Sequence, residues 1–255
     1  MKTKERSKMR PALQNFPLSK KAELRYMKTI IITGANGNLG SAVTNIFLSK
    51  GYQVVATVRV PEDLKELPQN RNLKAEVLDL TNEGETETFV QKIIDRHQTI
   101  DGALLLVGGF ATGNIASTKS VDIKKQISLN FDTAYHVARP LFHHMMEKNN
   151  GKIVFIGARP VLQASAGKSL IAYGLSKSLL FKLAEYLNAE AKGKNVTVSV
   201  VVPSTIDTEP NRKSMPGADF EKWVKPEALA AVLEFMISDK GSVLRETVLK
   251  AYNNA

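Results

Sequence analysis

The chain has 255 residues, enough for one α/β domain with a substantial core. Charged residues make up 24% and hydrophobic residues 43%, and no apolar run approaches the roughly 18 residues of a membrane span. The absence of cysteine excludes disulfides, thiolate metal sites and thiol nucleophiles. We therefore expect a cytoplasmic protein that has no membrane partner.

The net charge of +10 is concentrated at the N-terminus, where residues 1–26 hold eight basic and two acidic residues. A basic arm can contact nucleic acid or an anionic membrane. We interpret this one as a flexible, solvated extension that precedes a folded domain of residues 27–255. No nucleic-acid partner is expected.

From residue 28 onward, short apolar runs rich in β-branched residues alternate with amphipathic helical patterns. Because most of these runs lack in–out alternation, they are typical of strands buried on both faces of a parallel sheet. The pattern predicts one doubly wound, Rossmann-type α/β domain, with helices on both faces of a mostly parallel seven-stranded sheet. Strands are expected over residues 28–33, 52–58, 73–79, 102–108, 152–157, 196–202 and 242–249, and helices over 39–50, 83–97, 121–148, 171–192 and 226–238.

The first strand runs directly into TGANGNLGSAV, with glycines spaced GxxGxxG and a helix expected from about Asn38. Glycines at this position let the backbone approach a pyrophosphate, and the free N–H groups of the helix N-terminus bind its charge. A purely structural turn is the alternative. The segment predicts a dinucleotide site formed by Gly34, Asn36, Gly37, Asn38, Leu39 and Gly40.

The second strand ends at Arg59, close to where the adenosine ribose would lie. An arginine there can pair with a 2′-phosphate, whereas an acid accepts from a 2′-hydroxyl. The residue therefore favours NADP(H) over NAD(H). Arg59 could instead be a solvated cation, and Glu62 or Asp63 could still reach the ribose.

Two further segments are expected to line the nucleotide. Asp79 and Leu80 end the third strand and are placed to meet the adenine, although Asp79 could instead cap the helix that starts near Asn82. Gly108 and Gly109, in VGGFATG after the fourth strand, are small residues over which a cofactor can lie.

Tyr173 stands four residues before Lys177 on a predicted helix, so the phenol and the ammonium share one helical face. The ammonium is expected to lower the pKa of the phenol, which is ordinarily near 10, and to reach the nicotinamide ribose. Enzymes that use this pair keep a serine about thirteen residues upstream of the tyrosine. Here that position is Pro160, and Ala158 follows the strand end.

The ordered set of the glycine loop, Asp79, VGGFATG, Asn130, YGLSK and PSTIDT resembles the short-chain dehydrogenase/reductase family over about residues 28–250. Within it the chain is most similar to the dihydropteridine reductases, which share the segment DTEPNRKSMPGADFEKW (207–223) and keep alanine in place of the serine. Phe110 replaces the tryptophan of their Gly-Gly-aromatic turn, and Arg59 replaces the acid that suits NADH.

The resemblance implies that Asn130 supports a water in a proton relay, although it could be an ordinary helix amide. It also implies that Pro203, the backbone near Ile206 and the Thr208 hydroxyl hold the nicotinamide carboxamide. A homodimer or homotetramer is implied as well, with the two long helices that carry Asn130 and Tyr173 forming the seam between subunits.

Substrate contacts are expected from an apolar wall and a mobile flap, residues 209–223. The candidates for a flat ring are Phe110, Ala158, Met215 and Trp223, and packing would explain Phe110, Met215 and Trp223 equally well. No His/Asp/Glu cluster suggests a metal site.

These features predict an NAD(P)H-dependent oxidoreductase that transfers a hydride to a small-molecule substrate, a quinonoid dihydropterin or a similarly activated ring. A serine hydroxyl polarises a ketone, worth about 2–4 kcal/mol by analogy with other such donors. An electron-poor ring needs mainly a proton, so loss of the hydroxyl costs little. The alternatives are a general NADPH-dependent carbonyl or quinone reductase and a non-catalytic NADP(H)-sensing protein.

Overall fold

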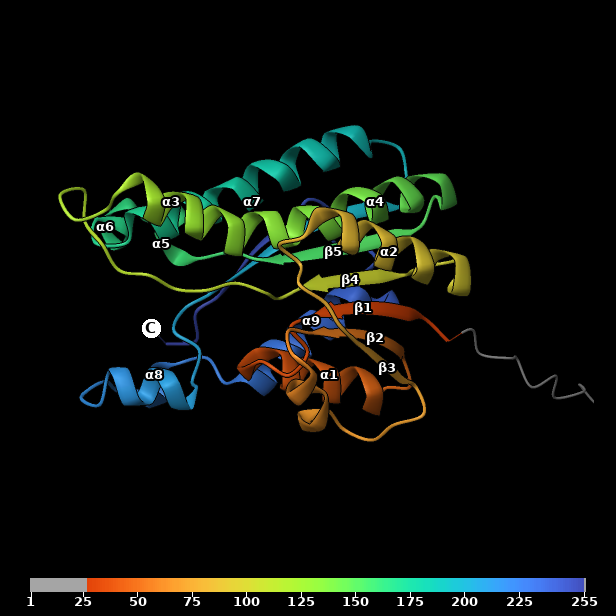
Figure 1. The fold of residues 1–255 in the computed structure, drawn as a ribbon, viewed down its shortest axis with the longest axis horizontal. Helices are drawn as coiled ribbons and strands as arrows, with labels where there is room; N and C mark the ends of the chain where they lie inside the picture. Colours follow the sequence, from red (N-terminus) through yellow and green to blue (C-terminus); the bar gives the residue numbers. More distant parts are fainter. Residues whose placement is uncertain (1–26, 255) are drawn as a thin grey trace, which may run out of the picture.

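The computed structural model describes residues 27–254, so the predicted extension of residues 1–26 lies outside the described part. The described chain forms a seven-stranded sheet in the order β3-β2-β1-β4-β5-β6-β7, with every neighbouring pair parallel (Figure 1). This confirms the doubly wound fold. The strands are β1 (Thr29–Thr33), β2 (Gln53–Val58), β3 (Leu73–Val77), β4 (Gly102–Leu105), β5 (Gly151–Ile156), β6 (Val196–Pro203) and β7 (Val248–Ala251).

Helices cover both faces of the sheet (Figure 1). One face carries α1 (Asn38–Ser49) and α9 (Pro226–Ile237), and the other carries α2 (Glu83–His97), α3 (Ser120–Ile127), α4 (Thr133–Lys148) and α7 (Ile171–Glu190). Each face therefore has its own hydrophobic core, one around Phe47 and Leu233 and the other around Phe89, Phe155 and Leu180. None of these described helices is both long and apolar enough to span a membrane.

The predicted helix over 121–148 is one continuous helical stretch that changes its winding midway. Between α3 and α4 lies a π-helical turn, η2 (Ser128–Asp132). A π-turn inserts one extra residue into the helix and rotates the side chains that follow, and such turns are frequent at functional sites. Here the turn contains Asn130.

Short helical segments occupy several connections for which no regular structure is predicted. Because each has six residues or fewer, hydrophobic periodicity is too short to reveal them. They are η1 (Pro61–Glu66), α5 (Arg159–Leu162), α6 (Ala164–Gly167), α8 (Glu209–Ser214), η3 (Phe220–Lys222) and η4 (Asp239–Gly241).

The seventh strand begins later than expected, at Val248 rather than at residue 242. Two features of the backbone explain the shift. Gly241 ends η4 against α9, where an added Cβ would lie 2.3 Å from the carbonyl oxygen of Phe235. Glu246 then adopts a left-handed conformation with φ of 50°, which an extended strand cannot contain.

Candidate active site

The glycine loop after β1 is held by contacts between backbone atoms. Gly34 has φ of +65°, in the left-handed region that favours glycine. A Cβ at Gly40 would lie 2.0 Å from the Gly34 carbonyl oxygen, and one at Gly37 would lie 3.2 Å from it. Because no side chain fits at Gly40, the spacing between Gly34 and Gly40 is a steric requirement of this turn.

The N-terminus of α1 opens at this turn with its first N–H groups available. Gly37 is the N-cap, no side chain caps the helix, and its first turn contains no acid. Asn38, Leu39 and Gly40 therefore present backbone N–H groups and the positive end of the helix dipole. Such a cradle, open to a backbone-sized group and lacking a competing carboxylate, fits a pyrophosphate.

After β2, Arg59 is exposed, whereas the acids Asp63 and Glu66 each accept hydrogen bonds from nearby groups. The Asp63 carboxylate accepts from the backbone N–H groups of Arg59 and Val60, both at 3.3 Å. Asp63 is thus engaged by its own turn. Glu66, which sequence reasoning missed, accepts from Asn36 Nδ2 at 3.1 Å and lies beside the glycine loop. Glu66 has no signal in the sequence pattern, because it is the last residue of the short helix η1, which brings it close to Asn36.

Asp79 is exposed just after β3, and its carboxylate accepts from the backbone N–H of Thr81 at 2.9 Å and from its hydroxyl at 2.7 Å. These hydrogen bonds, with Arg59 as a lesser cause, lower the pKa of Asp79. The cap of α2 is Asn82, which accepts from the Glu85 N–H, so Asp79 does not have the alternative capping role. Leu80 is buried beside it.

Asn130 ties the turn after β4 to the two helices that flank it. Its Oδ1 accepts from Gly109 N–H at 2.9 Å, and its Nδ2 donates to Gly109 O at 3.0 Å. Nδ2 also lies 3.0 Å from Gln126 Oε1 and 3.2 Å from Ser176 Oγ. Both ends of the Asn130 side chain are therefore hydrogen-bonded to protein groups.

Gly108 lies directly against this network. An added Cβ there would be 2.6 Å from Asn130 Oδ1 and 3.0 Å from Lys177 Nζ. The structure thus brings Gly108, Asn130 and Lys177 together from three separate segments. Gln126 and Ser176 complete the cluster, and both were missed because a polar residue on a helix carries no signal until its partner is known.

Tyr173 and Lys177 lie on α7 as predicted, but the electrostatics of the pair differ from the prediction. Lys177 is buried, donates from Nζ to the Ile156 carbonyl at 2.9 Å, and has its pKa lowered by burial from 10.5 to about 8. Burial raises the pKa of Tyr173 to about 12. The expectation that Lys177 lowers the pKa of Tyr173 is therefore wrong for this structure, because the ammonium bonds to a carbonyl and desolvation dominates.

The position of the absent serine is occupied by a short turn of helix. Ala158 is buried and forms the N-cap of α5, and Pro160 lies within the first turn of that helix. Pro160 also approaches α7, since a Cβ at Gly174 would lie 3.8 Å from Pro160 Cβ. An apolar ring therefore packs beside the residue that follows Tyr173, where a hydroxyl would otherwise be expected.

Phe110 faces Tyr173 edge-on, with ring centroids 5.2 Å apart and an interplanar angle of 69°. It is 66% exposed, so most of its surface is open to a ligand. The loop that carries Phe110 is fastened to the start of α7, because Gly113 N–H donates to Ser169 O at 2.8 Å and Ile171 N–H donates to Gly113 O at 2.9 Å. Figure 1 shows this loop running beneath α3 toward α5 and α6.

Residues 203–208 and the flap form the remaining wall. Pro203 is buried at the end of β6, Ile206 forms a bridge with Val224, and the Thr208 hydroxyl caps α8. Met215 is 40% exposed in the flap.

Trp223 is placed differently from Met215. It is only 6% exposed, and its ring packs 4.7 Å from that of Phe220. In this structure Trp223 contributes to the packing of the flap. Within residues 27–254, no cluster of His, Asp or Glu could hold a metal ion.

The fold and this site define the class of nucleotide-dependent α/β oxidoreductases. The chain belongs to the short-chain dehydrogenase family, whose model, described as short chain dehydrogenase, matches residues 28–218. The resemblance seen in the sequence is thereby confirmed.

Individual relatives are more distant. The 3-oxoacyl-(acyl-carrier-protein) reductase FabG of Buchnera aphidicola is 26% identical over 229 residues, which cover 85% of this chain and 92% of that protein. The dihydropteridine reductase of Dictyostelium discoideum is 28% identical over 212 residues, which cover 81% and 86%. The solved structure of ElxO with NADP bound has a TM-score of 0.81 at 24% identity, covering 88% and 96%, and shows the shared fold.

Proposed function

We propose that the protein is an NADPH-dependent reductase of quinonoid dihydropterins or similarly activated rings. The observation that carries the proposal is that apolar side chains surround Tyr173 where a hydroxyl donor is expected. Phe110 faces Tyr173, and Ala158 and Pro160 occupy the turn where a carbonyl-polarising hydroxyl would be expected. A conjugated, electron-poor ring accepts hydride without such a donor. The dihydropteridine reductase of Dictyostelium discoideum among the relatives supports this choice.

The cofactor contacts follow from the carboxyl edge of the sheet. Arg59 would pair with a 2′-phosphate, which its exposed position and the engagement of Asp63 by the backbone support. Lys177 would hold the nicotinamide ribose. The other residues proposed for the nucleotide are Gly34, Asn36, Gly37, Asn38, Leu39, Gly40, Asp79, Leu80, Gly108, Gly109, Pro203, Ile206 and Thr208.

The cofactor, when bound, supplies the hydride, and the protein must supply one proton to balance the reduction. With a pKa of about 12, Tyr173 holds its proton at neutral pH and can donate it to the reduced ring. Lys177 does not lower the pKa of Tyr173 in this structure, so its proposed role is to hold the nicotinamide ribose rather than to acidify the phenol. Asn130 would hold the Gly108–Gly109 turn against α7 through its side chain and would support a water in the proton relay.

A general carbonyl or quinone reductase is the second candidate. The 3-oxoacyl reductase of Buchnera aphidicola among the relatives supports it, because that name denotes reduction of a carbonyl. A protein that binds NADP(H) without turnover is the third. The buried Lys177 ammonium argues against the third, because a buried charge destabilises a fold that does not use it.

Steady-state kinetics with NADPH test the proposal against a quinonoid dihydropterin, a quinone, a ketone and a 3-oxoacyl thioester. We expect the dihydropterin to be reduced fastest and Tyr173→Phe to lower its kcat by about 100-fold or more. Tyr186→Phe is the matched control, since it removes the same hydroxyl from an exposed site on the same helix. Turnover of the carbonyl compounds alone would overturn the pterin assignment.

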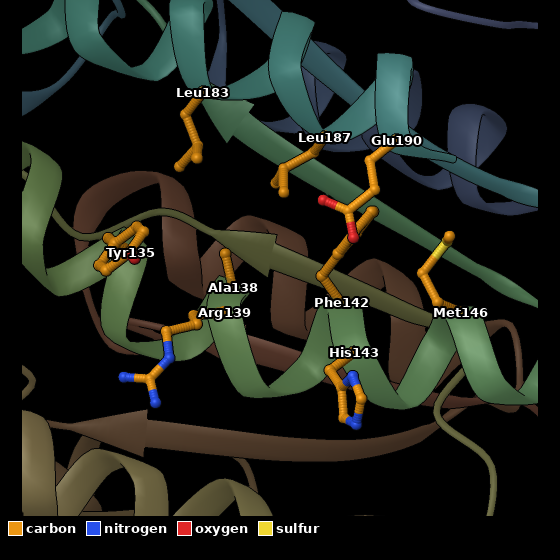
Figure 2. Close-up of a pocket in the computed structure, with 9 residues that line it drawn as sticks. All are labelled: Tyr135, Ala138, Arg139, Phe142, His143, Met146, Leu183, Leu187 and Glu190. Atoms are coloured by element: carbon orange, nitrogen blue, oxygen red, sulfur yellow. The ribbon is translucent and has the colours of Figure 1, made fainter. Parts of the chain in front are cut away.

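We also propose that two copies associate through α4 and α7. Figure 2 shows a groove between these helices, where Tyr135, Phe142 and Met146 of α4 face Leu183 and Leu187 of α7. Its polar lining residues are Arg139, His143 and Glu190. On the same helix as Leu183 and Leu187, Leu175 and Leu179 also expose apolar surface. Sedimentation equilibrium should give a dimer or tetramer that Leu179→Lys dissociates; a monomeric wild type would contradict the assembly.

A further inference from the structure

Arg159, the first residue of α5, is a cation without a carboxylate partner among residues 27–254. Its Nε donates to Gln163 Oε1 at 2.7 Å, and its guanidinium carbon lies 5.1 Å from the centroid of the Tyr252 ring. The side chain is half-buried. A guanidinium has five N–H donors, so this arrangement leaves its terminal nitrogens available for an acceptor that the described protein does not supply.

The cations of the neighbouring flap differ from Arg159, because each has an acid. Arg212 donates to both carboxylate oxygens of Asp207, at 2.5 and 2.7 Å. Lys213 pairs with Glu209 at 2.5 Å, and Lys222 pairs with Asp219 at 3.5 Å. Each cation of the flap is therefore paired with an acid, whereas none of the ion pairs among residues 27–254 includes Arg159.

The position of Arg159 links it to the proposed proton donor. It comes three residues after Ile156, whose carbonyl accepts from Lys177, and directly before Pro160, which packs toward Gly174 beside Tyr173. Substrates of open α/β sheets bind outside the carboxyl ends of the strands, and β5 ends here. Arg159 therefore lies on the same edge of the sheet as the reacting groups.

Hydrogen bonds hold the backbone around Tyr252, the aromatic partner of Arg159. Ser204 Oγ donates to the Tyr252 carbonyl at 2.8 Å, and Asn253 Nδ2 donates to the carbonyls of Glu221 and Trp223 at 3.0 and 3.1 Å. The C-terminal residues thus bridge the turn after β5 and the flap. In Figure 1 the C-terminus lies between α5 and α8, in agreement with these contacts. A guanidinium over an aromatic ring is attracted to the face of the ring and still has N–H groups that can donate to an acceptor elsewhere.

We propose that Arg159 determines substrate specificity by binding an anionic group, a carboxylate or a phosphate, on the molecule that is reduced. The inference rests on the proposed function in one respect, that the acceptor reacts beside Tyr173. Binding of the charged group at Arg159 fixes the orientation of the acceptor relative to Tyr173, which lowers the entropic part of the barrier. Planar, bidentate recognition of carboxylate and phosphate is the interaction for which arginine is best suited.

The test compares three quinonoid dihydropterins that differ only at C6, where they carry a methyl, a carboxymethyl or a phosphonomethyl group. A keto acid and its methyl ester form a second pair that does not depend on the pterin assignment. The wild type should reduce one of the anionic pterins with a kcat/KM about 10-fold or more above that of the methyl compound. The more favoured anion identifies the natural group as carboxylate or phosphate.

Arg159→Gln should remove most of this preference and change kcat/KM for the methyl compound by less than about twofold. Lys168→Gln is the matched control, since it removes one positive charge from an exposed site in the same connection and should leave the preference intact. Arg159→Lys keeps the charge without the planar fork and should retain only part of the preference.

Two results would overturn the proposal. One is a wild type that reduces charged and neutral acceptors equally, and the other is an Arg159→Gln variant that loses activity equally with all acceptors, as a structural role predicts. If no pterin is reduced but the keto acid exceeds its ester in an Arg159-dependent way, the pterin assignment fails and the role of Arg159 stands. If no acceptor is reduced, the affinities of three tetrahydropterins for the NADP-saturated protein are measured by calorimetric titration. The three ligands carry a methyl, a carboxymethyl or a phosphonomethyl group at C6. Equal affinities for all three would reject an anion site at Arg159.

Discussion

The connections after β1 and β5 occupy corresponding places at the carboxyl edge of the sheet, yet different kinds of contact hold them. The first is fixed by backbone against backbone, as the 2.0 Å approach of a Gly40 Cβ to Gly34 O shows. The second is fixed by side chains, with Pro160 near α7 and Arg159 on Tyr252. A backbone-fixed loop tolerates one residue type, whereas a side-chain-fixed loop can change with the substrate. The first can therefore serve a common nucleotide and the second a particular acceptor.

The largest effect is expected from placing the same methyl group against each connection, at Gly40 for the first and at Gly174 of α7 for the second. Gly40→Ala must open the glycine loop, which should cost more than about 3 kcal/mol in stability or reduce NADPH binding by over about 100-fold. Gly174→Ala, whose Cβ meets only Pro160 Cβ at 3.8 Å, should leave NADPH binding unchanged. For each variant, fluorescence titration measures the affinity for NADPH and urea unfolding measures the stability. Equal NADPH affinity for the two variants would contradict the difference between the loops.

A second prediction concerns the buried Lys177 ammonium. We expect it to be required for turnover and to lower the free energy of unfolding. A Lys177 pKa lowered from 10.5 to about 8 corresponds to roughly 3 kcal/mol of unfavourable charge burial at pH 7. Lys177→Met also loses the hydrogen bond to Ile156, about 1 kcal/mol, so we expect a net stabilisation of about 2 kcal/mol with loss of turnover. Urea unfolding checks the sign, and a destabilised variant would show that the charge is not costly.

The same pair of proteins gives a pH dependence with a defined sign. Between pH 8 and 10.5 the unfolded chain binds more protons at Lys177 than the folded chain does, so the free energy of unfolding of the wild type rises with pH relative to Lys177→Met. The stability difference between them should therefore narrow across this window and remain constant below it. A constant difference up to pH 10 would contradict the lowered pKa.

The smallest effect is expected at the rim of the nucleotide site. Arg59→Asp should shift the ratio of kcat/KM for NADPH over NADH by about 10-fold toward NADH, since Arg59 is exposed and solvent screens its charge. Arg71→Asp makes the same change in charge at an exposed position before β3 and should leave the ratio unaltered. An unchanged ratio in Arg59→Asp would assign ribose recognition to another residue, with Glu66 the nearest candidate.

Prediction from the sequence succeeded for elements with long, regular patterns. The sheet, the five main helical segments and the start of α1 at Asn38 follow from hydrophobic periodicity and glycine spacing. It missed the short elements around the substrate side and began the seventh strand too early, because Gly241 and Glu246 reveal their conformations only when α9 and the sheet are in place. The network of Gln126, Asn130 and Ser176 joins residues up to 50 positions apart, and no local pattern encodes it.

The amino-acid sequence by itself determined the doubly wound fold, the glycine turn and the presence of Tyr173 and Lys177 on one helix. These depend on local sterics and on the period of a strand or helix, which neighbouring residues specify. Only the tertiary structure decided that burial raises the pKa of Tyr173, that Lys177 bonds to Ile156, and that Arg159 lies on Tyr252 without an acid. Desolvation and charge pairing depend on which distant groups the fold brings together, so they are properties of the assembled chain.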